Sequence, residues 1–294
     1  MEINGLTKLY GIIGWPVTHS LSPLFQGYFI EDGGINAAYV PFAVAPEQLG
    51  VALDGLRALG IEGFNVTVPH KEEVFRLVDA DADARRIGAV NSVRRTASGW
   101  QAANTDWRGF SAVVKGLQLE LQGQDVLLFG AGGTARAVLH ALAILKVGRI
   151  FICNRNAQRL AALMKHAGHI YPDLTCLPLA WTADAVAGIS RASILLINTT
   201  SIGLQDGQLF PFLLSGDGAA IDAVYRPDGV TAFCLAARSG GREAVDGLPM
   251  LIAQGAASFA WWHDCPLPDC SAALNHIEAR LGRAPLYLPG WSGL

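Results

Sequence analysis

Short apolar segments alternate with segments of helical periodicity along most of the chain. The apolar segments are brief, rich in β-branched or aromatic residues, and bounded by Gly, Asn, Asp or Pro, a pattern typical of strands. We expect strands at Leu9–Ile13, Ala38–Phe42, Gly63–Val68, Val126–Phe129, Ile150–Cys153, Ile194–Ile197 and Ala219–Val224.

Helical periodicity fills the intervals. Residues Pro46–Leu59 place leucines near one face, and similar patterns occur at Ala135–Leu145, Gln158–Lys165, Leu251–Trp262 and Ser271–Leu281. Alternation of strand and helix predicts an α/β fold with largely parallel sheets.

A domain boundary is expected near Asp106–Gly123, because a strand, a glycine-rich turn and a helix follow this stretch. A second crossing is expected between Gly240 and Gly255. The predicted domains are therefore residues 1–106 with 255–294, and residues 107–254. We expect the C-terminal segment to pack back on the first domain.

Composition and charge narrow the function classes. Apolar residues make up 51% of the 294 and charged residues 16%, which excludes a disordered chain. The formal net charge of −3 is a poor match for nucleic acid, whose phosphates require a clustered basic face. No apolar run has the length of a membrane span, and the N-terminus lacks the features of a secretory signal. We expect a cytoplasmic protein without a membrane or nucleic-acid partner.

Cysteine usage agrees with that location. The five cysteines are scattered and none forms a CxxC pair, so neither a disulfide framework nor a zinc site is predicted. His166 and His169 have no carboxylate or thiol near them in sequence, and we expect no metal.

A dinucleotide-binding pattern follows the predicted strand Val126–Phe129. Residues Gly130 to Ala135 read Gly-Ala-Gly-Gly-Thr-Ala, the G-x-G-x-x-A pattern in strand–turn–helix context. Gly130 permits the tight turn, Gly132 lets a pyrophosphate approach the backbone, and Ala135 permits close packing of helix on strand. The alternative is an ordinary tight turn between strand and helix.

The next strand distinguishes the two dinucleotides. An NAD site usually has an acidic residue about 20 residues after the glycines, bonded to the ribose 2′-hydroxyl. Here no Asp or Glu occurs between Asp125 and Asp173, and the strand is followed by Asn154, Arg155 and Arg159. Two arginines one helical turn apart suit a 2′-phosphate, so we expect NADP. The alternative is a helix start with solvated arginines.

Ser20 and Ser22 form a first polar cluster, before Pro23. In an extended stretch their hydroxyls face the same way, and Pro23 suits the start of a helix. Paired hydroxyls beside helix N–H groups would bind a carboxylate; alternatively Ser22 only caps the helix.

A second cluster, Asn65 to Lys71, reads Asn-Val-Thr-Val-Pro-His-Lys. Val68 is expected to be extended because it precedes proline, and Pro69 suits the first position of a helix. Lys71 then lies in the first turn, where the helix dipole disfavours a cation. Such a lysine is either solvated or has a lowered pKa that suits proton transfer.

The third cluster comprises Asn91 and the run Asn104-Thr105-Asp106. Asp106 precedes a predicted helix, so capping is its simplest role. Paired with a buried lysine, it would instead hold the ammonium group during reduction of a carbonyl.

The motifs HSLSP, NVTVPHK, GAVN, NTD, GAGGTA, NR…R and a late YRP…Gln occur in this order over residues 8–263. Together they resemble the shikimate dehydrogenase family, which includes shikimate/quinate dehydrogenases. The resemblance implies a substrate-binding domain and a Rossmann-type NADP-binding domain facing each other across a cleft. It implies an oxidoreductase of the shikimate pathway that reversibly reduces 3-dehydroshikimate to shikimate by hydride transfer.

The resemblance also implies roles for single residues. Lys71 and Asp106 would be the catalytic pair. Ser20 and Ser22 would hold the substrate carboxylate. The other expected substrate-binding residues are Thr67, Asn91, Thr105, Tyr225 and Gln254. The expected cofactor-binding residues are Gly130, Ala131, Gly132, Gly133, Thr134, Asn154, Arg155, Arg159, Ala223 and Gly247. A monomer or homodimer is expected.

The chain departs from the family pattern at Phe25-Gln26-Gly27, at Ala103 and at Asn198-Thr-Thr-Ser201. These departures leave open a paralogue that acts on quinate or a related ring acid. A non-catalytic dinucleotide sensor is a further alternative, but a pure binder needs neither Lys71 nor Asp106.

Overall fold

The computed structural model describes residues 3–291 and 293 and divides into two compact units. Unit 1 comprises the chain up to Gly109 together with Leu251–Ile277, and unit 2 comprises Phe110–Met250 together with Glu278–Trp291. The chain passes from one unit to the other after Gly109, after Met250 and after Ile277. The segment Glu278–Trp291 was expected to pack on the first domain but belongs to unit 2. Its Arg283 forms a buried ion pair with Asp246 of that unit.

Unit 1 is built on a mixed sheet of order β2-β1-β3-β5-β6-β4. Its strands are β1 (Lys8–Gly14), β2 (Ala37–Ala43), β3 (Gly63–Val66), β4 (Asp79–Ala80), β5 (Ser92–Thr96) and β6 (Gly99–Ala103). The β1–β2, β1–β3 and β4–β6 pairs are parallel. The β3–β5 and β5–β6 pairs are antiparallel, so the expectation of largely parallel strands holds only in part in this sheet.

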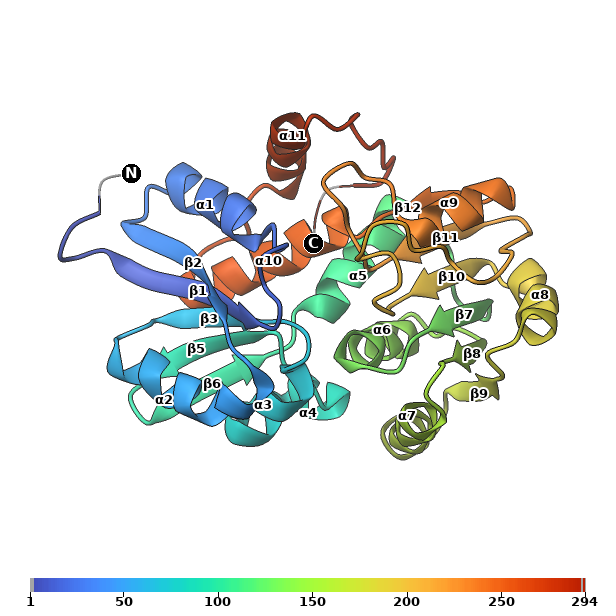
Figure 1. Ribbon diagram of the computed structural model, residues 1–294, viewed down its shortest axis with the longest axis horizontal. Coiled ribbons are helices and arrows are strands. Elements are labelled where there is room, and N and C mark those ends of the chain that lie inside the picture. The colour runs from blue at the N-terminus through green and yellow to red at the C-terminus, as the bar shows by residue number, and fades with distance from the viewer. Residues whose placement is uncertain (1–2, 292, 294) are drawn as a thin grey trace. The chain divides into compact units, whose positions relative to one another are not determined.

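Helices cover both faces of that sheet (Figure 1). One core cluster joins the sheet to α2 (Leu49–Ala58), α3 (Lys71–Leu77) and α4 (Ala82–Ile87); a short 3-10 helix, Pro46–Gln48, leads into α2. The other face packs against α1 (Ser22–Asp32) and α10 (Leu248–His263), where the Tyr10 ring of β1 lies beside the Trp262 ring of α10.

The contact between α1 and α10 requires a glycine. Phe25 is fully buried, and a Cβ added at Gly255 of α10 would overlap its ring. The next side chain along α1 completes the contact, because the Gln26 amide donates to the Gly255 carbonyl at 3.0 Å. Phe25 and Gln26, which depart from the family pattern, therefore serve packing between these helices.

Unit 2 is a parallel sheet of order β9-β8-β7-β10-β11-β12. Its strands are β7 (Asp125–Phe129), β8 (Arg149–Cys153), β9 (Thr175–Leu179), β10 (Leu195–Asn198), β11 (Ala219–Asp222) and β12 (Glu243–Val245). Its helices include α6 (Gly133–Ile144), α7 (Ala157–Ile170), α8 (Ala183–Ala192) and α9 (Ala232–Ser239). This order is that of the doubly wound dinucleotide-binding fold, as predicted.

Two further helices, α5 (Asp106–Gly116) and α11 (Cys270–Leu281), include residues of both units. Within the described residues, no helix combines the length and the apolarity needed to cross a bilayer.

Every strand and helix expected from the hydrophobic pattern is present, with ends displaced by a few residues. The pattern missed β4, β5, β6, β9 and β12. These strands are short or rich in polar residues, and β9 contains Pro178 at the sheet edge, where proline removes no ladder hydrogen bond.

We predict that Gly255→Ala lowers the free energy of unfolding by about 1–3 kcal/mol, the usual effect of overpacking a core. Gly50→Ala is the matched control, because an added Cβ on α2 meets no atom within 4 Å. It should be neutral or stabilising by about 0.5–1 kcal/mol. Urea unfolding of both variants measures the difference, and equal stabilities would contradict the packing assignment.

Candidate active site

Lys71 is the first residue of α3, and its backbone carbonyl accepts a hydrogen bond from the Val90 amide at 3.0 Å. The expectation that Pro69 opens this helix is wrong. The helix begins after His70, whose ring Nε2 lies 2.7 Å from the Val44 carbonyl. That contact fixes the chain just before the lysine.

Asp106 is the first residue of α5, and its carboxylate faces Lys71. The Lys71 Nζ donates to Asp106 Oδ2 at 2.5 Å, and the two side chains are only 13% and 6% exposed. The other oxygen, Oδ1, accepts from Asn91 Nδ2 at 2.8 Å. The two sequence segments expected to form an acid–base pair are thus in contact.

Asn91 connects this pair to two more of the expected residues. Its Nδ2 lies 2.9 Å from Thr105 Oγ1 and 2.8 Å from Gln254 Oε1, and its Oδ1 accepts from the Thr105 amide at 2.7 Å. An amide NH₂ has two hydrogens but here faces three acceptors, including Asp106. The Thr105 hydroxyl can in turn donate to Gln254 Oε1 at 3.4 Å, so these side chains form one hydrogen-bonded group.

A second layer, missed by the sequence analysis, supports Thr105. Ser258 Oγ lies 3.0 Å from Thr105 Oγ1 and accepts from Asn65 Nδ2 at 3.1 Å. The Tyr39 hydroxyl donates to Asn65 Oδ1 at 2.8 Å, which sets the orientation of that amide. Two signals pointed here: Asn65 is polar within an apolar strand, and Ser258 follows Gln254 by one helical turn.

Ser20 and Ser22 have a different geometry from the one expected. Leu21 has helical dihedrals, φ −84° and ψ −1°, so the stretch is not extended. Ser22 begins α1 and does not cap it, while Ser20 Oγ accepts from the Ser22 amide at 3.2 Å. Among the described residues neither hydroxyl bonds to Lys71 or Asp106.

Thr67 lies just after β3, half-buried. Its methyl group packs so closely on Gly14 of β1 that a Cβ there would overlap it. Thr67 is therefore fixed at the carboxyl end of two neighbouring parallel strands, where ligands of such sheets commonly bind.

The glycine-rich turn lies where the order of unit 2 reverses, between β7 and β10. Gly130 has φ +116°, and an added Cβ would overlap the Thr199 side chain. Gly132 precedes α6, and an added Cβ there would meet nothing within 4 Å. An open glycine at a helix N-terminus fits the pyrophosphate of a dinucleotide. Ala131, Gly133 and Thr134 complete this turn.

The side chains expected to bind a 2′-phosphate follow β8. Asn156 caps α7, and its Oδ1 accepts from the Arg159 amide at 2.9 Å. Arg155 precedes that cap, so the expectation that both arginines share one helical turn is wrong. Both guanidinium groups are exposed, and neither forms an ion pair within the described residues. Asn154 is held by its Nδ2, which donates to the Asn156 carbonyl at 2.8 Å.

The loops after β10, β11 and β12 are bonded together. Asp222, at the end of β11, accepts from Asn198 Nδ2 at 2.8 Å and from the Val224 amide at 2.9 Å. The Gly247 amide donates to the Val224 carbonyl at 2.9 Å. Burial raises the pKa of the Asp222 carboxyl to about 7, although these hydrogen bonds and one from Thr231 lower it.

The remaining predicted residues of unit 2 belong to this region. Ala223 follows Asp222 directly, and its carbonyl leaves no room for a Cβ at Gly247. Tyr225 is half-buried two residues later.

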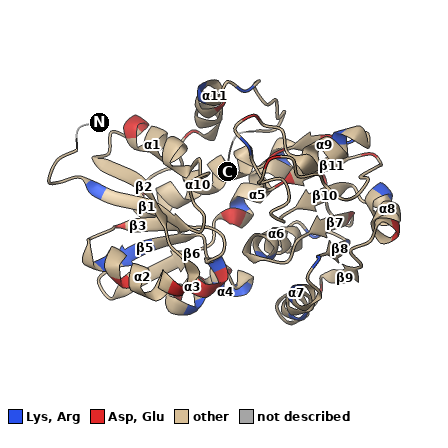
Figure 2. Cartoon of the chain, in the orientation of Figure 1, with Lys and Arg blue, Asp and Glu red and all other residues tan. Residues whose placement is uncertain are grey.

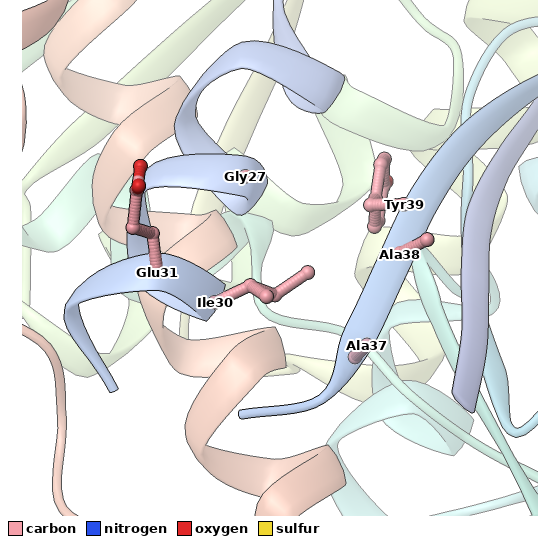
Figure 3. Close-up of a pocket in the computed structure, with 6 residues that line it drawn as sticks. All are labelled: Gly27, Ile30, Glu31, Ala37, Ala38 and Tyr39. Atoms are coloured by element: carbon pink, nitrogen blue, oxygen red, sulfur yellow. The ribbon is translucent and has the colours of Figure 1, made fainter. Parts of the chain in front are cut away.

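Other surface features offer weaker candidates. A pocket between α1 and β2 is lined by Gly27, Ile30, Glu31, Ala37, Ala38 and Tyr39 (Figure 3). Its Tyr39 hydroxyl is already bonded to Asn65. Acidic and basic residues are interspersed along α3 and α4 (Figure 2), so these helices form no continuous basic face. No group of metal-ligating side chains occurs among residues 3–291 and 293.

Comparison with known proteins places the chain among dehydrogenases of one family. Residues 12–93 match the model of the shikimate dehydrogenase substrate binding domain, and residues 112–201 match the model described as shikimate / quinate 5-dehydrogenase. The shikimate dehydrogenase (NADP(+)) of Aquifex aeolicus is 38% identical over 270 residues, which cover 90% of this chain and 95% of that protein.

Solved structures show the same similarity. The crystal structure of shikimate dehydrogenase from Aquifex aeolicus has a TM-score of 0.82 at 36% identity, covering 96% of this chain and all of that one. Shikimate 5-dehydrogenase from Thermus thermophilus, solved in complex with NADP(H) and shikimate, has a TM-score of 0.80 at 34% identity, covering 94% of this chain and 100% of that one.

Proposed function

This chain belongs to the shikimate dehydrogenase family, and we propose that it catalyses the reversible NADP-dependent reduction of 3-dehydroshikimate to shikimate. The observation that carries this proposal is the contact between Lys71 and Asp106, 2.5 Å apart and nearly enclosed. A protein that only bound a dinucleotide would have no use for such a pair.

Reduction of a ketone to an alcohol needs one hydride and one proton. When bound, NADPH supplies the hydride to the carbonyl carbon. In this proposal the Lys71 ammonium group donates the proton to the carbonyl oxygen, and it recovers a proton from that hydroxyl in the reverse direction. Asp106 holds the ammonium group and stabilises its charge, and Asn91 orients the carboxylate through the 2.8 Å bond to Oδ1.

The proposed substrate-binding groups match a small polyhydroxy acid. Asn91, Thr105 and Gln254 form one hydrogen-bonded group beside the catalytic pair. Their remaining donors and acceptors suit ring hydroxyls. Ser20 and Ser22 are proposed to hold the carboxylate, with Thr67 and Tyr225 as further contacts.

The proposed cofactor is NADP, and the residues of unit 2 fit it. Gly130, Gly132 and Gly133 would accept the pyrophosphate at the start of α6. The exposed guanidinium groups of Arg155 and Arg159, with Asn154, would bind the 2′-phosphate. Ala223 and Gly247 would contact the nicotinamide through backbone groups.

The cellular location and the oligomeric state are also proposed. We infer a cytoplasmic enzyme, which the five free cysteines support because disulfides are rare in that compartment. We also infer a monomer or homodimer without a nucleic-acid partner, consistent with the net charge of −3. Sedimentation at several protein concentrations tests the oligomeric state.

The substrate is tested by initial rates with shikimate and quinate, each with NADP⁺ and NAD⁺. We expect the highest kcat/KM for shikimate with NADP⁺. A preference for quinate would instead favour the alternative in the description shikimate / quinate 5-dehydrogenase. Binding of NADP⁺ without oxidation of either acid would favour a sensor.

Lys71→Ala should lower kcat by about 10²–10⁴-fold, the usual contribution of a general acid–base group, with a smaller change in KM. Lys165→Ala, which removes an exposed lysine of α7, is the control and should leave kcat unchanged. Steady-state kinetics measures both. A normal kcat for Lys71→Ala would remove this lysine from the mechanism.

Arg155→Ala should weaken NADP⁺ binding by roughly 10- to 100-fold, because a hydrogen bond to a charged group contributes about 1.5–3 kcal/mol. NAD⁺ lacks the 2′-phosphate, so its affinity should hardly change. Arg191→Ala removes an exposed arginine of α8. This control variant shows whether the loss of one positive charge anywhere on the surface weakens NADP⁺ binding. Equal losses for both dinucleotides would contradict the proposed phosphate contact.

A further inference from the structure

Asp222 is a buried carboxyl group for which the proposed mechanism has no use. It is the last residue of β11 and is fully buried. Burial of an ionised carboxylate is costly unless it is paired or hydrogen-bonded. Within the described residues no lysine or arginine forms an ion pair with Asp222; its Oδ1 accepts hydrogen bonds, whereas Oδ2 is buried without a partner.

Those hydrogen bonds join two loops. The Asp222 carboxylate accepts from the Asn198 side chain and from the Val224 amide. Asn198 in turn accepts from the Thr200 amide at 3.0 Å and from its hydroxyl at 2.7 Å. One carboxylate oxygen therefore fixes both the loop after β10 and the loop after β11.

A third loop is attached to the same group. The Gly247 amide, after β12, donates to the Val224 carbonyl. Gly247 also lies so close to the Ala223 carbonyl that no side chain fits between them. Ala223 and Gly247 are the residues proposed to contact the nicotinamide, and both therefore depend on the loops that Asp222 holds.

Two buried carboxyl groups face each other in this cluster, and burial raises the pKa of both Asp222 and Asp246. Asp246, after β12, is paired with Arg283 at 3.0 Å, and its charge raises the pKa of Asp222. Cys234 of α9 stays a neutral thiol, since burial raises its pKa to about 12. Thr231, which caps α9, is uncharged and lowers the pKa of Asp222 by hydrogen bonding.

We propose that Asp222 is a positioning residue for the nicotinamide end of the cofactor. Its ionised carboxylate holds the three loops in the arrangement that binds this end, because charge-assisted hydrogen bonds are about twice as strong as neutral ones. Protonation weakens the bonds from Asn198 and Val224 and loosens the loops. This inference rests on the proposed NADP-dependent function.

The test compares NADPH with 2′-phospho-ADP-ribose, which has the same phosphates but no nicotinamide. The ratio of their dissociation constants isolates the nicotinamide end, because titration of the shared phosphates cancels. NADPH is used since its ring is uncharged, which excludes direct attraction to a carboxylate. If the loops bind the ring only when Asp222 is ionised, a pKa of about 7 makes the preference for NADPH grow about tenfold from pH 6 to pH 8.

Asp222→Asn should abolish this pH dependence and keep the preference for NADPH at its low-pH value. Asn198→Ala, which removes the partner side chain, should do the same. Affinity for 2′-phospho-ADP-ribose should be unchanged in both variants, which shows that unit 2 is folded.

A constant ratio in the unmodified protein overturns the proposal without reference to any variant. A normal pH-dependent ratio in Asp222→Asn also overturns it. Failure of the unmodified protein to bind either ligand contradicts the proposed cofactor itself. Tight binding of both with no pH dependence contradicts only the role of Asp222.

Discussion

The proposed chemistry depends on the ion pair between Lys71 and Asp106. Each residue begins a helix, and the N-terminal end of a helix favours an anion and disfavours a cation. Asp106 is therefore well placed on α5, whereas Lys71 is not on α3. Glu72 and Glu73 supply negative charge in the first turn of α3, and Asp106 supplies the direct partner. The lysine therefore lies at a position that the helix dipole disfavours but that suits the proposed proton transfer.

The ion pair holds its geometry because a neutral network surrounds it. A nearly enclosed pair stabilises a protein only when its remaining polar atoms are bonded. Asn91 meets that need for Asp106, and Thr105 and Ser258 keep Asn91 in place. Amides and hydroxyls perform this task without adding charge. Truncation of any member would leave a buried partner unbonded, which is more costly than the value of one hydrogen bond.

The sequence predicted best what local rules determine. The glycine turn at Gly130, the α/β fold class and the strand positions followed from composition and spacing over short windows, whereas the Rossmann-type unit followed from the family resemblance. Local rules failed where neighbours in space decide the conformation: Leu21 is helical rather than extended, and α3 begins after Pro69. The antiparallel strands β5 and β6 were missed for the same reason, because their polar residues carry little periodicity.

Contacts between distant segments lay beyond such rules. Lys71 and Asp106 are 35 residues apart, and nothing in their spacing requires a contact; only the family resemblance brought them together. Tyr39 had no individual signal, and Ser258 had only its position one helical turn after Gln254. Asn198 and Asp222 are recognisable in the sequence as polar residues beside apolar strand residues. Their contact could not be inferred without the register of β10 against β11.

Asp222 shows how stability and function oppose each other in unit 2. Because burial raises its pKa, the folded state favours the protonated carboxyl; this contribution to stability is complete below the ordinary pKa and is lost as pH rises through about 7. An asparagine would avoid that loss and fill the same space. What the ionised acid offers in exchange is stronger hydrogen bonds to Asn198 and to the Val224 amide. The loops that these bonds join lie at the carboxyl edge of a dinucleotide-binding sheet, where ligands of such sheets commonly bind.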